Sequence, residues 1–283
     1  MRFFIVDAFT REPFGGNPAG VVLLERGQSF PPEVLMTQVA AELRYSETAF
    51  VQPCDDGHFT LRYFTPTGEV DLCGHATIAS FGVLLHEGIV APGDTCINHT
   101  LAGDLTVSIG DQVMMEMAPP RVVETPIDIP RLKRIMGVSD NDVAALPPEI
   151  ISTGLPDIIL PIDTVENLNA LSPDMDAMAT LSDELHVVGV HAFAMVEDGY
   201  TAHVRNFAPL YGIPEESATG TANAALTHYL YRHGIIASPA ECRFLQGTTL
   251  GRPSIVATKL LQDGTIHIGG TSRVIATGTL RLT

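Results

Sequence analysis

A short segment occurs twice in this chain, and the repeat constrains the fold more than any other feature of the sequence. The segments Cys-Gly-His-Ala-Thr-Ile-Ala and Thr-Gly-Thr-Ala-Asn-Ala-Ala have their glycines, Gly74 and Gly220, 146 positions apart. Fourteen positions after each stands another glycine, Gly88 and Gly234. A span of this length predicts a helix of about four turns that is closed by the second glycine. Since both spans are apolar on most faces, we expect two buried helices.

The repeat extends upstream of both helices. Residues 62–66 read Arg-Tyr-Phe-Thr-Pro and residues 205–209 read Arg-Asn-Phe-Ala-Pro, with arginine, phenylalanine and proline in register. The residues that lead into them, Phe59 to Phe64 and Thr201 to Phe207, partly alternate between apolar and polar types and predict strands. A coincidence of common residues is the alternative. The pattern therefore predicts an α+β fold of two similar domains, each a sheet wrapped around one buried helix.

Other segments mark the elements around this repeat. Residues 32–44 predict an amphipathic helix with a proline near its start, and residues 174–185 predict another helix. The four prolines of residues 118–130 predict a linker. We therefore expect domains at residues 1–118 and 119–283, and leave open whether the last strand, near residues 272–282, returns to the first domain.

Composition excludes several classes of function. The net charge of −17 would repel a phosphate backbone, so nucleic acid is not expected as a partner. The apolar stretch from Leu72 to His86 is too short to span a bilayer, which argues against a membrane protein. Asp7 interrupts the apolar run that a signal peptide would need. The four cysteines show no paired spacing, and we expect a reducing, cytoplasmic location.

The two glycine-led helices suggest a site for a small anion. A helix N-terminus presents unpaired N–H groups and the positive end of the helix dipole, and glycine allows a ligand to approach the backbone. If the two domains are related by a pseudo-dyad, both N-termini would point into one cleft. The alternative is that Gly74 and Gly220 are only turn residues that precede core helices.

Three residues of the first half carry chemistry that could serve such a site. Glu47 follows an apolar helix, and partial desolvation there would raise the pKa of its carboxyl so that it could act as acid and base. By residue type alone, a surface glutamate is the better interpretation. His75 would be a neutral imidazole in the first helical turn, or a histidine that satisfies local backbone groups. Cys73 has Thr219 as its counterpart, so a racemase with two thiols lacks its second one, and packing is the expected role of Cys73.

The second half offers fewer candidates. Glu216 precedes the second helix, where it could bind a substrate amine or hydroxyl or merely interact with the helix dipole. Asn17 could face the cleft or could serve its turn. Sequence motifs for zinc proteases, dinucleotides, phosphate loops and serine hydrolases do not occur. We therefore expect no metal and no cofactor.

Taken together, these residues resemble the PhzF family of phenazine biosynthesis-like isomerases, whose fold is related to that of diaminopimelate epimerase. The resemblance runs over nearly the whole chain. It implies two domains, each a barrel-like, mostly antiparallel sheet around a central helix, often in a homodimer. It implies a cofactor-independent isomerase that moves a proton on a small anionic metabolite. The segments that carry the resemblance are residues 6–9, 16–20, 46–50, 62–66, 72–77, 207–209, 218–222, 246–247 and 251–254.

The resemblance also assigns roles to single residues. It makes Glu47 the general acid and base, which reverses the interpretation from residue type alone. The expected catalytic residues are thus Glu47, His75 and Glu216. Glu216 and Thr221 stand where phenazine-pathway members have aspartate and serine, so that reach and pocket shape would differ. The expected substrate-binding residues are Asn17, Ser46, Cys73, Gly74, Thr219, Gly220 and Thr221.

Two other functions stay open at this stage. An amino-acid epimerase or racemase could use Glu47 or Cys73 on one face of a carbon atom. A non-catalytic metabolite-binding protein could have kept the cleft and lost turnover, which the substitutions at Glu216 and Ser217 would explain. The sequence does not name the substrate.

Overall fold

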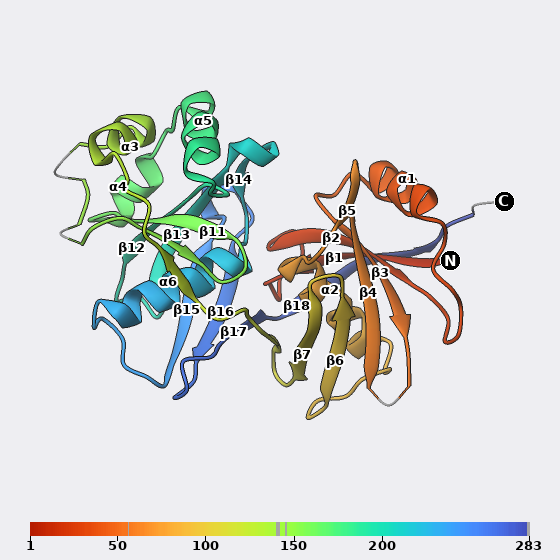
Figure 1. Ribbon diagram of the computed structural model, residues 1–283. Helices are drawn as coiled ribbons and strands as arrows, with labels where there is room; N and C mark the ends of the chain where they lie inside the picture. The colour runs from red at the N-terminus through yellow and green to blue at the C-terminus, as the bar shows by residue number, and fades with distance from the viewer. Residues whose placement is uncertain (56, 140–141, 145, 282–283) are drawn as a thin grey trace. The chain divides into compact units, whose positions relative to one another are not determined.

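The fold consists of two compact units. The computed structural model describes residues 1–55, 57–139, 142–144 and 146–281. Unit 1 contains residues 1–116 together with the C-terminal residues from Gly269 onward, and unit 2 contains Met117–Ile268. The C-terminal strand thus goes with the first unit rather than with the range 119–283. In Figure 1 this strand, in dark blue, runs beside the red N-terminal strand, with which it pairs.

Unit 1 is a mostly antiparallel sheet with two helices. Only two of its strand pairs, β2–β3 and β4–β6, are parallel among the pairings given for the described residues. Its strands are β1 (Arg2–Ala8), β2 (Asn17–Leu23), β3 (Thr48–Pro53), β4 (His58–Thr65), β5 (Gly68–Val70), β6 (Thr95–Thr100), β7 (Gly103–Ile109), β8 (Val113–Glu116) and β18 (Ser272–Thr279), and its helices are α1 (Glu33–Leu43) and α2 (Gly74–His86).

Unit 2 has the same kind of sheet and more helices. Its strands are β9 (Arg121–Val123), β10 (Glu149–Ser152), β11 (Pro156–Pro161), β12 (Val190–Met195), β13 (Ala202–Ala208), β14 (Ile213–Glu216), β15 (Ala240–Gln246) and β16 (Ser254–Leu260), and β17 (Ile266–Gly270) spans the sequence boundary between the units. Its helices are α3 (Ile129–Met136), α4 (Val165–Ala170), α5 (Met175–Leu185) and α6 (Gly220–Arg232), with short 3₁₀ turns η1 (Pro209–Tyr211) and η2 (Thr248–Leu250).

The strand pairing repeats from one unit to the other. In unit 1, β2 pairs in parallel with β3, β3 and β5 pair antiparallel with β4, and β6 pairs in parallel with β4. In unit 2, β11, β12, β13, β14 and β15 follow the same scheme in the same order. The repeat predicted from a few residues therefore extends to five strands of each sheet, and the predicted α+β fold is confirmed.

Helices α2 and α6 are the buried helices that the repeat predicts. Each has 13 residues and follows an extended N-cap residue, Cys73 or Thr219. One residue beyond each C-cap, Gly88 and Gly234 both have φ +69°, the left-handed conformation that glycine adopts at least cost. Most residues of both helices are buried, as expected for helices that are apolar on most faces.

Strands of unit 2 are covered on both faces. Ile150, Ile158 and Ala192 pack in one apolar cluster with residues of α3, α4 and α5. Their neighbours Ile151 and Ile159 pack in another cluster with residues of α6. Figure 1 shows α3, α4 and α5 gathered on the side of these strands away from α6. Because side chains alternate along a strand, the residues that share a face with Ile159 point towards α6.

The predicted helices are confirmed, but the predicted linker is not. Helices α1 and α5 lie within the ranges 32–44 and 174–185. The range 118–130, expected as a linker, contains strand β9 and the first residues of α3 instead. Prolines only flank the three residues of β9, which therefore keep their N–H groups for pairing with β10.

Each unit contains an arginine–glutamate pair at equivalent positions. Arg62 on β4 makes two hydrogen bonds to Glu69, of 2.7 and 2.5 Å. Arg205 on β13 makes two to Glu215, of 2.9 and 2.7 Å, and its third nitrogen donates to three backbone carbonyls. The side chain of Arg205 is 9% exposed and that of Arg62 is 25% exposed. The second pair is therefore the more deeply buried one.

Removal of each glutamate in turn should show that the two pairs differ in burial. Glu215→Ala leaves the buried Arg205 charge without its carboxylate, and we expect a loss of about 3–5 kcal/mol in the free energy of unfolding. Glu69→Ala, the matched control, leaves a charge that water can reach and should cost about 1 kcal/mol or less. Urea unfolding of both variants measures the difference. Equal losses would contradict the difference in burial.

Candidate active site

Glu47 lies in the short connection between α1 and β3. Arg44 closes α1 in the left-handed conformation with φ 62°, and the Glu47 carbonyl accepts a hydrogen bond of 3.3 Å from the Gly20 N–H on β2. A Cβ at Gly20 would lie 2.7 Å from the Thr48 hydroxyl oxygen, so only glycine allows this close approach. The connection is thus fixed on both sides, and the side chain of Glu47 is 18% exposed.

The first turn of α2 brings His75 to this carboxylate. His75 Nε2 lies 3.4 Å from Glu47 Oε2 and 3.5 Å from the Ser46 hydroxyl oxygen. On the other side of the ring, Nδ1 lies 3.3 Å from Cys73 Sγ. The side chain of His75 is only 5% exposed. Four residues predicted for the site, Ser46, Glu47, Cys73 and His75, therefore lie together in unit 1.

Glu47 has an incompletely satisfied carboxylate. Its Oε2 atom is buried and accepts no hydrogen bond from the described residues. Leaving such an oxygen unpaired costs about 1–3 kcal/mol. The atom lies 3.4 Å from His75 Nε2 but makes no hydrogen bond with it. A buried acceptor without a donor needs an explanation, and a functional role is one such explanation.

A buried polar chain supports the N-terminus of α2. The Asn98 amide donates to the Tyr63 hydroxyl (3.0 Å), Tyr63 lies 2.7 Å from the Thr77 hydroxyl, and Thr77 donates to the Cys73 carbonyl (2.8 Å). Because that carbonyl can only accept, Thr77 accepts from Tyr63, and each hydrogen is assigned. Burial raises the pKa of Tyr63, which keeps its hydroxyl neutral as the donor.

In unit 2, the predicted residues gather around the start of α6. Thr219, the N-cap residue, donates from its hydroxyl to Glu216 Oε2 over 2.6 Å. Gln246 accepts from the Thr219 N–H (3.1 Å) and donates to the Glu216 carbonyl (2.8 Å). Thr221 lies in the first turn, where its carbonyl accepts from the Thr153 hydroxyl over 2.9 Å. Glu216, Thr219, Gly220 and Thr221 are thus neighbours, as predicted.

Other predicted residues have local structural explanations. Asn17 is the first residue of β2, opposite Ala8, and is 5% exposed. The preceding Gly16 has φ +66°, and a Cβ there would lie 2.1 Å from the Ala8 carbonyl oxygen. The predicted meeting of the two helix N-termini stays a prediction.

Several polar residues of unit 2 were missed by the sequence analysis. His191 and Asn206 face each other across β12 and β13, and Asn223 and Gln246 connect them to Thr219. The sequence carried one usable signal, because His191 interrupts a run of apolar residues in a strand that is buried on both faces. A histidine in that setting needs partners.

The residues of unit 1 could also hold a metal ion. Ligand atoms of Glu47, Cys73 and His75 lie within 4.8 Å of one another, and a thiolate, an imidazole and a carboxylate together suit Zn²⁺. Such an ion would occupy the Glu47 carboxylate, the Cys73 thiolate and the His75 imidazole together.

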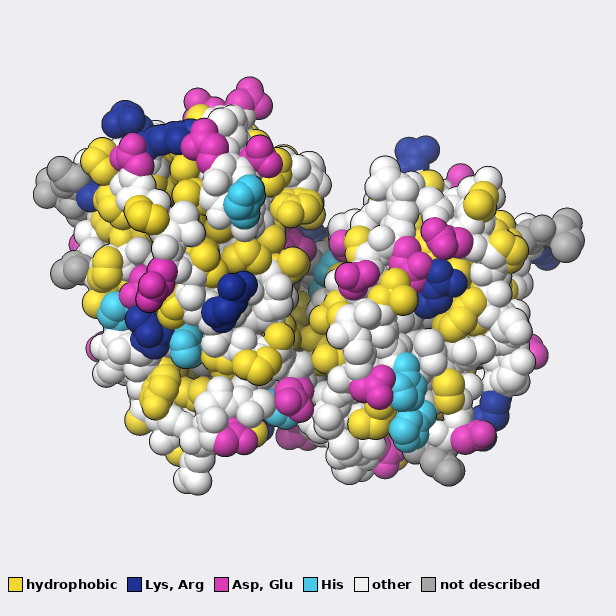
Figure 2. Space-filling view, viewed as in Figure 1, with side chains coloured by type: hydrophobic (Ala, Val, Ile, Leu, Met, Phe, Trp, Pro, Cys, Tyr) yellow, Lys and Arg dark blue, Asp and Glu magenta, His cyan; other side chains and the backbone are white. Residues whose placement is uncertain are grey.

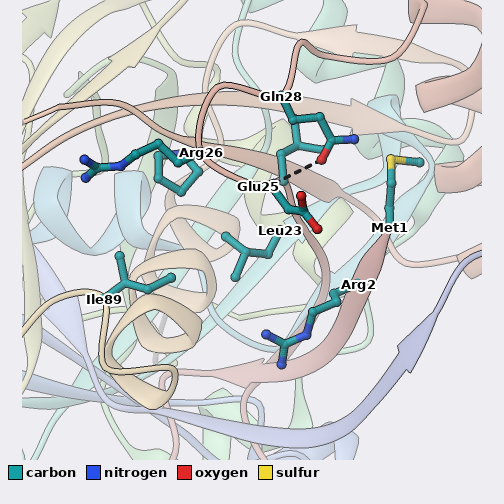
Figure 3. A pocket seen from close by; sticks show the side chains of 9 residues that line it. Met1, Arg2, Leu23, Glu25, Arg26, Gln28 and Ile89 are labelled. Atoms are coloured by element: carbon teal, nitrogen blue, oxygen red, sulfur yellow. Dashed lines mark hydrogen bonds between the residues drawn. The ribbon is translucent and has the colours of Figure 1, made fainter.

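Two openings in unit 1 lie away from these residues. One of them, a cavity of about 520 Å³, is lined by the N-terminal residues, the end of β2 and Ile89, among others (Figure 3). The two arginines that line it are already paired, Arg2 with Glu87 and Arg26 with Asp55. Figure 2 shows acidic side chains spread over the visible face, in keeping with the net charge of −17. A groove that attracts anions through basic side chains is thus not found at this cavity.

No helix among the described residues is both long and apolar enough to cross a bilayer.

Comparison with known proteins supplies the relatives of this chain. The family model described as "Phenazine biosynthesis-like protein" (PhzC-PhzF) matches residues 6–278. A Deinococcus radiodurans protein named "Uncharacterized isomerase" is 36% identical over 289 residues, which cover 96% of this chain and 92% of that protein. The trans-2,3-dihydro-3-hydroxyanthranilate isomerase of Pseudomonas fluorescens is 30% identical over 269 residues, covering 91% and 90%.

Solved structures agree in fold. The Bacillus anthracis phenazine biosynthesis protein of the PhzF family superposes with a TM-score of 0.89 at 26% identity and covers 100% of this chain and 99% of that one. A hydroxyproline epimerase from Agrobacterium vitis has a TM-score of 0.64 at 16% identity and covers 98% and 91%. The second likeness concerns the fold alone, and together they confirm the epimerase-like architecture that was predicted.

The unpaired carboxylate oxygen predicts a gain in stability when its charge is removed. In Glu47→Gln, no ionised oxygen is left buried without a donor, and we expect the free energy of unfolding to rise by about 1 kcal/mol. Urea unfolding at neutral pH measures this. Glu42→Gln, on the exposed surface of α1, is the matched control and should change stability by less than about 0.5 kcal/mol. A clear loss of stability in Glu47→Gln would contradict the interpretation of Oε2.

Proposed function

The chain belongs to the phenazine biosynthesis-like (PhzC-PhzF) family and is an isomerase, and on this premise we propose that it moves a proton on a small carboxylate-bearing substrate without a cofactor. The observation that carries the proposal is the Glu47 carboxylate, whose buried Oε2 lies 3.4 Å from His75 Nε2 and accepts no hydrogen bond from the described residues. General acid–base catalysis needs such a group within reach of a substrate proton.

In the proposed reaction, Glu47 first takes a proton from a carbon atom of the substrate. The electron pair of the broken C–H bond enters the conjugated system, and the double bond shifts. The Glu47 carboxyl then returns the same proton to another carbon of that system. Atoms and charge balance without a co-reactant, because the product is an isomer of the substrate and Glu47 ends as it began.

Neighbouring residues would hold the substrate during this transfer. His75 Nε2 faces the side on which both Glu47 and Ser46 lie, so an N–H there can donate to a substrate oxygen or to the Glu47 carboxylate. A substrate carboxylate would bind at the first turn of α2, near Gly74. The Cys73 side chain makes no capping hydrogen bond to this helix in the described structure, and the helix dipole favours an anion there.

The corresponding elements of unit 2 are assigned by the same proposal. Glu216, with Thr219 beside it, would bind a polar substituent of the substrate. Gly220 and Thr221 would contribute to binding, as would Asn17 of unit 1. The P. fluorescens relative acts on trans-2,3-dihydro-3-hydroxyanthranilate, which suggests a substrate that carries amino and carboxylate groups. A homodimer and a cytoplasmic location belong to this proposal as well.

One observation favours a second candidate function, an amino-acid epimerase. Cys73 Sγ lies 3.3 Å from His75 Nδ1 at a helix N-terminus, where a thiolate is stabilised. Cys73 could therefore serve as an acid or base on one face of a carbon. Loss of solvent exchange at a stereocentre in Cys73→Ser, with no double-bond shift in the wild-type protein, would favour the epimerase.

The test is the conversion of trans-2,3-dihydro-3-hydroxyanthranilate, and of a panel of small hydroxy- and amino-carboxylates, followed by ¹H NMR in D₂O. We expect double-bond migration by the wild-type enzyme. Glu47→Gln keeps the shape of the side chain but cannot accept the proton, and it should lower kcat by about 10²–10⁴-fold.

Glu42→Gln serves as the control again and should retain full activity. Full activity of Glu47→Gln on a substrate that the wild type converts would refute the role of Glu47. Tight binding of a metabolite with neither conversion nor deuterium incorporation by the wild type would instead indicate the non-catalytic binding protein.

Added zinc should inhibit the enzyme. Zn²⁺ bound by Glu47, Cys73 and His75 would block the acceptor oxygen, and a chelator should restore activity. Cys73→Ser should be markedly less sensitive, because it lacks the thiolate ligand. Activity that depends on added zinc, or that a chelator abolishes, would contradict the proposed cofactor-independent reaction.

A further inference from the structure

A row of side chains with metal-binding groups crosses the outer face of the sheet in unit 1. Its members are Cys54, His58, His99 and Asp104, which follow or belong to the strands β3, β4, β6 and β7. Figure 1 shows these four strands side by side, and their pairings give the same order. Spacing along the sequence does not reveal the row, because each member comes from a different strand or strand end.

The strand register places all four side chains on one face of the sheet. His99 is the register partner of Asp104 on β7 and of Thr60 on β4. His58 stands two residues before Thr60 and therefore points to the same side. The Cys54 N–H donates to the His58 carbonyl across the hairpin, and Cys54 Sγ lies 3.5 Å from the Thr60 hydroxyl oxygen. The thiol therefore lies on this face as well.

Two imidazole nitrogens lie at the separation that a shared metal ion requires. His58 Nδ1 and His99 Nε2 are 3.0 Å apart. A Zn²⁺–N distance of about 2.0–2.1 Å puts two nitrogens on one ion about 2.8–3.4 Å apart, for angles between a right angle and the tetrahedral angle. The two nitrogens face each other in a hydrogen bond, so binding needs the rings to tilt until both lone pairs point at one ion. It does not need the rings to separate.

Asp104 leaves the correct nitrogen of His99 available. Its Oδ1 atom lies 2.7 Å from His99 Nδ1, and a carboxylate can only accept a hydrogen bond. Nδ1 therefore carries the hydrogen, and Nε2 of the neutral ring keeps the lone pair that faces His58. Histidines that bind metal ions in proteins almost always donate their other N–H to a carboxylate, a carbonyl or water, which fixes the ring. The Asp104–His99 pair thus has the arrangement of a metal ligand and its supporting group.

His58 needs only a change of tautomer to act as a ligand. Because His99 Nε2 accepts, His58 Nδ1 is the donor of the hydrogen bond between the two rings. His58 is exposed, so exchange with water can move this hydrogen to Nε2 and leave a lone pair on Nδ1. Neutral imidazole is the form of histidine that binds metal ions.

Cys54 can supply a third ligand. It stands across the hairpin from His58, and the Cβ atoms of such opposite residues lie about 4.5–5.5 Å apart. A rotation about the Cα–Cβ bond of Cys54 therefore brings the thiol towards the imidazoles. Its contacts with the Thr60 hydroxyl (3.5 Å) and the Gln52 carbonyl (3.7 Å) oppose this little, since a thiol forms only weak hydrogen bonds. One thiolate and two imidazoles suit Zn²⁺.

We propose that Cys54, His58 and His99 bind one Zn²⁺ ion on this face, and that Asp104 orients His99. Water completes the tetrahedral coordination, and the Cys54 thiol releases its proton when the ion binds. An ion can enter from solvent, because the side chains of His99 and Asp104 are 35% and 67% exposed. The net charge of −17 also attracts cations to the protein.

This site is separate from the group of Glu47, Cys73 and His75. His58 is the first residue of β4, whereas Glu47 immediately precedes Thr48, which pairs with Phe64 near the other end of that strand. The two groups can therefore be tested one at a time.

Zinc binding, measured by isothermal titration calorimetry after treatment with a chelator, tests the site. The measurements use Cys73→Ser, so that the thiolate of the other group is absent, and we expect one ion per chain. Asp104→Asn should weaken binding by about 10–100-fold, as for other groups that support a ligand. His58→Gln and His99→Gln each remove a ligand and should weaken binding by more than Asp104→Asn does.

Cobalt identifies the thiolate ligand. Co²⁺ added to Cys73→Ser should produce the near-ultraviolet charge-transfer absorption of a cobalt–thiolate bond, and a further Cys54→Ser substitution should abolish it. The two remaining cysteines, Cys96 and Cys242, are buried and lie outside the row. The matched control is His203→Gln, which removes an imidazole that lies 2.8 Å from the Asp198 carboxylate in unit 2. It should change neither the absorption nor the affinity for zinc.

Urea unfolding without metal shows first that each variant is folded, as expected for substitutions on an outer face of the sheet. Absence of zinc binding in Cys73→Ser would overturn the proposal, as would binding that His58→Gln and His99→Gln leave unchanged. A charge-transfer band that survives Cys54→Ser would refute the three-ligand site. None of these measurements depends on isomerase activity, so this site and the proposed function can fail separately.

Discussion

The hydrogen bonds at the backbone of residues 73 and 219, just before helices α2 and α6, organise both units. Each helix is buried inside a sheet, so the peptide groups at its start must find partners within the protein. In unit 1, Thr77 donates to the Cys73 carbonyl, and in unit 2, Asn223 donates to the Thr219 carbonyl. These two residues occupy the same position of their helices. Because a carbonyl only accepts, each bond sets the direction of the polar chain behind it.

The burial of the start of helix α2 also determines which side chains of unit 1 lie together. A helix whose interior is fully packed and whose first residue is glycine keeps its N-terminus close to neighbouring loops. In unit 1 the neighbouring loop carries Ser46 and Glu47, and the first turn carries His75, so the carboxylate and the imidazole meet with little adjustable structure between them. The close packing at Gly20 holds that loop in place. The proton transfer proposed for this site needs this kind of fixed geometry.

Much of this arrangement could be predicted from the sequence, and the remainder shows where patterns fail. Spacing alone gave the repeat, the buried helices and their closing glycines, since these depend on local backbone geometry. The role of Glu47 came only from resemblance, because burial of its oxygen depends on β2 and α2, which are distant in sequence. Prolines at positions 118–130 suggested a linker but flank strand β9 instead. The polar chain of unit 2 joins residues of several strands and of helix α6, and no periodicity encodes it.

The buried polar chains of the two units are built from different chemical groups. Unit 1 uses Tyr63, whose hydroxyl burial keeps neutral, and the chain there carries no group that changes charge under ordinary conditions. At the equivalent position unit 2 has Asn206, whose amide nitrogen lies 3.3 Å from the ring of the buried His191. A doubled architecture can thus build one buried polar core from hydroxyl groups and the other from amides and an imidazole. A protein built from a single copy would have only one of these two cores.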